Sequence, residues 1–211
     1  MTTTALDDLQ SLTALQLDAL REVANMGAGH AATALSQMTG ATIMISVPEI
    51  QVARLEELPP ELGPAEQPVA GVLMDMLGDL TGRTLLVFPK HTVMRMAELM
   101  LRRPHGSSVA LGELERSAIK EAGNILSGAY MNALSDFMGM VLLPSPPTLA
   151  VDTSHAVLSR RFLRISEDVE RVFVVETEFM MQEVGERLRG FFLLLPDPAS
   201  LQAILRTIRL A

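Results

Sequence analysis

Two pairs of polar residues recur along the chain at one spacing: Glu22 with Asn25, and Glu121 with Asn124. Residues three apart lie on the same side of a helix, about one turn from each other. The carboxylate of each pair can bind a cation, and the amide can both donate and accept hydrogen bonds. Repeated on two helices, such pairs predict a polar docking face on which another macromolecule could lie.

The sequence around the pairs is duplicated. Windows 18–50 and 117–149 align without a gap at an offset of 99, and ten of 33 positions are identical. Chance would give about two or three. The identities include Pro48 and Pro147, each 22 intervening residues after its asparagine, and a proline in a sheet marks an edge or a bend. We predict one domain over 1–211, built of repeats at approximately 12–103 and 111–211.

Each repeat is predicted to contain a long helix, short strands and a second helix. Helical spacing of apolar residues predicts helices at roughly 13–38, 91–101, 112–137 and 199–209. Runs of β-branched and apolar residues predict strands at 42–47, 69–77, 84–88, 148–153, 171–180 and 189–195. The proline-rich segment 56–68 is expected to form an acidic, solvated loop. The fold class is therefore α+β, with a sheet shared by two pseudo-symmetric repeats.

On a helical wheel the two pairs lie opposite the apolar stripe, so they are expected to face outward, together with Asp18 and Ser117. A single Glu/Asn pair would fit an ordinary solvated helix, and the repetition favours a docking face. The segment NMGAGH, residues 25–30, lacks the ending of a phosphate-binding loop. Its small residues are expected either to let the helix pack closely or to leave its outer face open.

Composition excludes several other functions. A net charge of −8 argues against a general nucleic-acid binder, since phosphate contacts need a basic surface. The four histidines have no metal-ligand spacing, so no metal site is expected. The apolar runs are too short to cross a bilayer, and the first ten residues show no secretory signal. With no cysteine in the chain, these features fit the reducing cytoplasm.

The motif as a whole, Asp or Ser, three residues, Glu, two residues, Asn, 22 residues and Pro, resembles the site pattern of the CheC, CheX and FliY chemotaxis phosphatases. The match occurs twice, at the positions Asp18, Glu22, Asn25, Pro48 and Ser117, Glu121, Asn124, Pro147. Two complete sites in a chain of this length resemble the CheC branch most. The resemblance implies a CheC-like fold with an antiparallel sheet flanked by helices.

The resemblance also implies an activity, which is hydrolysis of the aspartyl phosphate on phosphorylated CheY. Asn25 and Asn124 would orient the attacking water, and Glu22 and Glu121 would pair with a lysine of CheY. No cofactor is expected beyond the Mg²⁺ that CheY itself would supply. A second expected partner is CheD. The alternative is a non-enzymatic adaptor that binds CheD or phosphorylated CheY, or a scaffold of the flagellar-switch type.

Overall fold

The computed structural model describes residues 14–58, 62, 68–165, 171–181 and 185–210. The helices in these ranges are α2 (Ala14–Thr39), the 3₁₀ helix η1 (Leu55–Glu57), α3 (Lys90–Met100), α4 (Glu113–Met138), α5 (Ser154–Val157), α6 (Arg160–Leu163) and α7 (Pro198–Leu210). The strands are β1 (Ile43–Ile45), β2 (Glu49–Arg54), β3 (Pro68–Gly78), β4 (Gly82–Pro89), β5 (Leu142–Pro144), β6 (Thr148–Thr153), β7 (Arg171–Met181) and β8 (Glu186–Pro196).

These strands form an eight-stranded antiparallel sheet within the described residues. Its order is β1-β7-β8-β4-β3-β5, with β2 also on β7 and β6 also on β3. Strands β1 and β2 of the first half of the chain therefore pair with β7 of the second half. Strands β5 and β6 of the second half pair in the same way with β3 of the first half. The predicted α+β class with a shared antiparallel sheet is confirmed.

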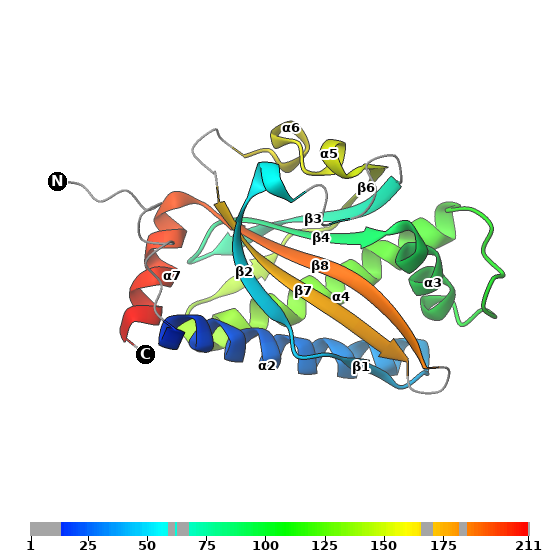
Figure 1. Ribbon diagram of the computed structural model, residues 1–211, viewed down its shortest axis with the longest axis horizontal. Helices are drawn as coiled ribbons and strands as arrows, with labels where there is room; N and C mark the ends of the chain where they lie inside the picture. The colour runs from blue at the N-terminus through cyan, green and yellow to red at the C-terminus, as the bar shows by residue number, and fades with distance from the viewer. Residues whose placement is uncertain (1–13, 59–61, 63–67, 166–170, 182–184, 211) are drawn as a thin grey trace.

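Helices α2 and α4 lie together across one face of the sheet, and α3 joins them at one end (Figure 1). The core between these helices and the sheet contains Leu35, Leu126 and Phe192. Both long helices end at glycines with left-handed backbone conformations, Gly40 at φ 75° and Gly139 at φ 64°. Glycine adopts this conformation without the steric penalty of a Cβ atom, which fixes where each helix stops.

The other face of the sheet is covered by η1, α5 and α6, and α7 packs near the start of α2 (Figure 1). Neighbouring residues of one strand thus enter opposite cores, as Phe191 and Phe192 of β8 do. This explains continuous apolar runs in an antiparallel sheet. The prediction of a solvated loop at 56–68 was wrong in part, because Leu58 and Leu62 are buried in the second core. Glu56 and Glu57 belong to η1 and Pro68 begins β3, whereas residues 59–61 and 63–67 lie outside the described residues.

Tyr130, the one tyrosine of the chain, joins α4 to the sheet. Its ring stacks on Phe192 at a centroid distance of 4.6 Å, and its hydroxyl is hydrogen-bonded to Thr177 Oγ1 at 3.0 Å. Burial raises the pKa of Tyr130 to about 12, and the hydrogen bond to Thr177 only partly offsets this. The folded protein therefore keeps this phenol neutral at a pH where the unfolded chain ionises it.

We expect the contribution of Tyr130 to stability to be complete below about pH 10 and to be lost as the pH rises towards 12. Absorbance titration of the native protein should follow this single phenol, and we expect its midpoint near pH 12. Tyr130→Phe should be about 1 kcal/mol less stable at neutral pH, because it leaves Thr177 without its partner. A native midpoint near pH 10 would contradict the buried, hydrogen-bonded hydroxyl.

Candidate functional site

The two polar pairs occupy matching places on α2 and α4. Each asparagine is the twelfth residue of a 26-residue helix. Glu22 and Glu121 are exposed, and Asn25 and Asn124 are half-buried, whereas Ala24 on the opposite side of α2 is buried. The predicted outward orientation of the pairs is therefore confirmed, and their catalytic role stays a prediction.

None of the four side chains forms a hydrogen bond or an ion pair with the described part of the chain. Asp18, the first motif position, differs in this respect, because it accepts a hydrogen bond from Arg21 at 2.7 Å. Ser117, the equivalent position on α4, is exposed. Asparagine is a poor helix former, and here neither asparagine forms a compensating hydrogen bond with a described residue. The free amides and carboxylates are available to a partner.

The two pairs lie on neighbouring antiparallel helices. Arg102, shortly before α4, donates hydrogen bonds to the carbonyl oxygen of Met38 near the end of α2, at 3.1 and 3.2 Å. These bonds tie the segment that follows α3 to the C-terminal end of α2. At the middle of the pair the backbones approach closely, and the Cα of Gly27 faces the ring of Tyr130. This close packing makes one rigid layer that carries both pairs.

Pro48 and Pro147 lie at bends of the edge strands, as predicted. Each proline follows a short strand and precedes a longer one, and both strands pair with the same partner strand. This partner is β7 for Pro48 and β3 for Pro147. Between the flanking pairs, residues 46–48 oppose 177–178, and residues 145–147 oppose 74–75. Three residues against two is a β-bulge, which bends the strand and tolerates a proline. The prolines shape the sheet edge beside each long helix.

Ser36 and Ser135, duplicated on the long helices, have a structural role. The Ser36 hydroxyl donates to the carbonyl of Ala32 at 2.7 Å and accepts from the backbone N–H of Ile43 at 3.0 Å. The Ser135 hydroxyl donates to the carbonyl of Met140. Ser36 thus ties the end of α2 to β1, and Ser135 ties the end of α4 to the residues just before β5. In the sequence, both serines are duplicated polar residues like the Glu/Asn pairs, so duplication alone could not separate their structural role from a functional one.

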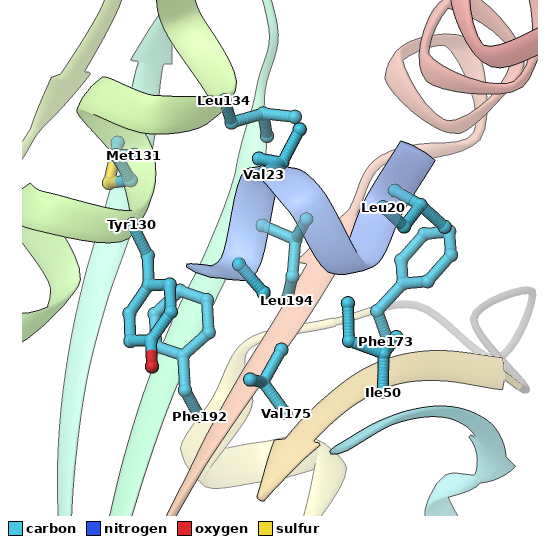
Figure 2. Close-up of a pocket in the computed structure, with 11 residues that line it drawn as sticks. Leu20, Val23, Ile50, Tyr130, Met131, Leu134, Phe173, Val175, Phe192 and Leu194 are labelled. Carbon is cyan, nitrogen blue, oxygen red and sulfur yellow. The ribbon is translucent and has the colours of Figure 1, made fainter. Parts of the chain in front are cut away.

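An apolar pocket of about 50 Å³ lies where α2 and α4 meet the sheet (Figure 2). Its lining includes Leu20 and Val23 of α2, Met131 of α4, and Phe173 of β7. None of the four paired residues lines it. A small apolar space offers no polar partner to a water or an anion, so it is a packing feature of the core.

Two absences within the described ranges concern metal sites and membrane spans. Within them, no cluster of three or more His, Cys, Asp or Glu side chains is arranged to hold a metal ion. Of the described helices, none is both long and apolar enough to span a membrane.

Comparison with known proteins gives the family. The model of the CheC-like family matches residues 15–52 and 114–151, two stretches related by the same offset of 99 that relates the two pairs. The CheY-P phosphatase CheC of Bacillus subtilis is 35% identical over 191 residues, which cover 90% of this chain and 91% of that protein. The chain belongs to the CheC-like family. The resemblance inferred from the motif is confirmed.

Other members of this group agree with the CheC-like assignment. The flagellar motor switch phosphatase FliY of B. subtilis is 26% identical over 144 residues, covering 66% of this chain and 36% of FliY. The crystal structure of Thermotoga maritima FliY matches with a TM-score of 0.78 at 23% identity, covering 94% of this chain and 98% of the other. The second comparison shows that the CheC-like fold extends over nearly the whole molecule.

Proposed function

We propose that this chain is a phosphatase that hydrolyses the aspartyl phosphate of phosphorylated CheY, with one Glu/Asn site on each long helix. Two of its relatives are named a CheY-P phosphatase and a flagellar motor switch phosphatase. The observation that carries the proposal is the pair of outward amides, Asn25 and Asn124, each one turn from a carboxylate; neither the amides nor the carboxylates bond to a described residue. A scaffold alone would have no need of two such amides.

The proposed site consists of side chains on helix surfaces, and this suits a macromolecular substrate. A helix face encloses no small molecule, so the phosphoryl group must lie in a pocket of the partner. The partner then supplies the enclosure, the acyl phosphate and its own Mg²⁺, which neutralises charge on the phosphoryl oxygens. What this chain adds is one amide placed beside the phosphorus and one carboxylate that fixes the docking register.

In the proposed reaction, Asn25 or Asn124 accepts a hydrogen bond from a water molecule through its side-chain oxygen and holds the water in line with the scissile bond. The water oxygen bonds to phosphorus while the bond from phosphorus to the aspartyl oxygen breaks. The products are inorganic phosphate, which takes up the oxygen and the protons of the water, and a free aspartate. A neutral amide adds no negative charge near the phosphoryl anion, and positioning contributes much of such catalysis.

Glu22 and Glu121 have the anchoring role in this proposal. Both are exposed and unpaired in the described part of the chain, so each can form an ion pair with a lysine of CheY without breaking an internal bond. Such a pair adds electrostatic complementarity and fixes the register of docking. Asp18 and Ser117 would lie at the rim. We extend the proposal to a cytoplasmic location and to CheD as a second partner.

The experiment that tests the function is the decay of phosphorylated CheY, followed as phosphate release with substoichiometric protein. We expect one chain to turn over many CheY molecules, because the proposed attack by water forms no covalent bond to this chain. Stoichiometric binding that leaves the spontaneous decay rate unchanged would instead support the adaptor or scaffold.

Salt should weaken the interaction. The Debye length falls from about 10 Å at 0.1 M salt to about 3 Å at 1 M, and exposed ion pairs are screened accordingly. We expect the KM for phosphorylated CheY to rise several-fold over this range. Glu22→Gln/Glu121→Gln should start from a higher KM and respond less to salt. An equal salt response in both proteins would exclude the anchoring role of the two carboxylates.

A further inference from the structure

Helices α2 and α4 contain four glycines away from their ends, and these divide into two kinds. Gly27 and Gly123 are buried at close contacts. A Cβ atom added at Gly27 would lie 2.6 Å from Cδ1 of Tyr130, and one added at Gly123 would lie 2.6 Å from Cγ1 of Val72. Both distances are far below normal van der Waals contact. Packing inside the protein therefore accounts for these two glycines.

Gly29 and Gly128 have no such explanation. A Cβ atom at either position would have no atom within 4 Å other than its own helix and chain neighbours. Neither has the positive φ that favours glycine over other residues. A glycine inside a helix lowers helix stability relative to alanine, since it loses more backbone freedom on folding. The fold thus carries this cost twice, at equivalent positions, with no internal contact in return.

Both open glycines lie four residues after an asparagine of the proposed site, Gly29 after Asn25 and Gly128 after Asn124. Residues four apart lie one above the other on a helix surface. A helical side chain also leans towards the N-terminus and covers the turn that precedes its own Cα. Any side chain at Gly29 or Gly128 would therefore lie over the turn that carries the amide.

We propose that Gly29 and Gly128 are positioning residues that let the phosphorylated surface of the partner approach each asparagine closely. This inference rests on the proposed function of the same sites. A single added methyl carbon extends about 1.5 Å from the helix backbone. A displacement of about 1 Å in a positioned group can lower a rate about 100-fold. The missing side chains thus set how near the amide comes to the phosphorus.

The test uses proteins with one working site. Gly29→Ala is made in an Asn124→Ala background, and Gly128→Ala in an Asn25→Ala background, and phosphate release from phosphorylated CheY is measured. We expect kcat/KM to fall at least 10-fold in each and to fall further with glutamine at the same glycine. We also expect the Tm to rise by about 2–4 °C, because alanine is the better helix former and meets no clash.

Gly27→Ala and Gly123→Ala are the matched controls on the same helices, and their Tm should fall because the new Cβ clashes. A Gly29→Ala or Gly128→Ala protein with unchanged kcat/KM, beside an inactive Asn25→Ala/Asn124→Ala protein, would overturn this inference alone. Activity and Tm that fall together would also overturn it, since the glycines would then be structural. An Asn25→Ala/Asn124→Ala protein with full activity would instead overturn the proposed function.

Discussion

Replacing both Asn25 and Asn124 by alanine is expected to reduce the protein-stimulated hydrolysis of phosphorylated CheY by roughly 100-fold or more. The reason is that each amide is proposed to hold the attacking water in line, and the loss of a positioning group of this kind has about that effect. Each single variant should retain activity through the other helix. The measurement is phosphate release over a range of CheY concentrations, so that kcat and KM are separated.

The stability of the double variant serves as the control in this experiment, because it shows whether the substitutions disturb the fold. Neither asparagine bonds to the described part of the chain, and alanine has the higher helix propensity, so the double variant should be at least as stable as the native protein. Equal thermal unfolding together with lost hydrolysis would locate the effect at the site. A double variant that hydrolyses phosphorylated CheY at the native rate would contradict the assigned role.

The largest expected effect on stability belongs to Arg95 of α3, which lies between two carboxylates. Its Nε donates to Glu186 at 2.7 Å, and its Nη1 lies 3.5 Å from a carboxylate oxygen of Glu98. The other oxygen of Glu98 accepts from the backbone N–H of Ser108 at 2.9 Å. Arg95→Met should destabilise the protein by about 3 kcal/mol, because it leaves the buried Glu98 carboxylate without its cation.

This network also predicts a pH dependence. Burial raises the pKa of Glu98, but hydrogen bonds from the backbones of Ser108 and Gly106 and the charge of Arg95 outweigh it, so the net pKa lies below 4.5. A lowered pKa stabilises the folded state above the unfolded value, and this contribution is lost as the pH falls through the folded value. The difference in the free energy of unfolding between the native protein and Arg95→Met should therefore become smaller below pH 4.5.

Urea unfolding at neutral pH and near pH 4 measures both effects. Arg95→Met/Glu98→Gln is the control, because it also removes the negative charge of Glu98 that Arg95→Met leaves unpaired. At neutral pH this double variant should recover more than half of the stability that Arg95→Met loses. If the difference in the free energy of unfolding between the native protein and Arg95→Met stays constant across this pH range, the packing contacts of Arg95, and not its charge, stabilise the fold.

The long elements could be predicted from local patterns, and their partners could not. Apolar periodicity located α2 and α4 to within one residue at each end, because each helix buries a continuous stripe against the sheet. The pairing of β1 and β2 with β7 joins residues more than a hundred positions apart. Strand periodicity identifies a buried face but carries no information about which strand lies beside it.

Short elements were missed for a related reason. Strand β5 has three residues and stands just before a bulge, so it shows too little alternation to be recognised. Met38 has the apolar character and the helical spacing of the buried stripe of α2, yet it is 43% exposed. Its neighbour Thr39 is buried instead, and the Thr39 hydroxyl donates to the carbonyl of Leu35 at 2.8 Å. Polarity alone suggested the opposite arrangement at this helix end.

The Glu/Asn pairs could be identified from the sequence because they occur twice at one spacing. The glycines required coordinates. The sequence left two explanations for the small residues of NMGAGH, and the structure assigns one to each glycine, close packing at Gly27 and an open surface at Gly29. The Arg95–Glu98 pair was also missed, since charged residues three apart on a helix are usually exposed.

In the proposed mechanism the amides act on the bound phosphoryl group and not on docking. Single-turnover hydrolysis with protein in excess over phosphorylated CheY tests it most directly, because the plateau rate at saturation no longer depends on affinity. We expect Asn25→Ala/Asn124→Ala to reach half of its plateau rate at nearly the same protein concentration as the native protein, and we expect this plateau to lie close to the rate of spontaneous decay. A double variant that reaches the native plateau at higher protein concentration would show that the asparagines serve binding alone.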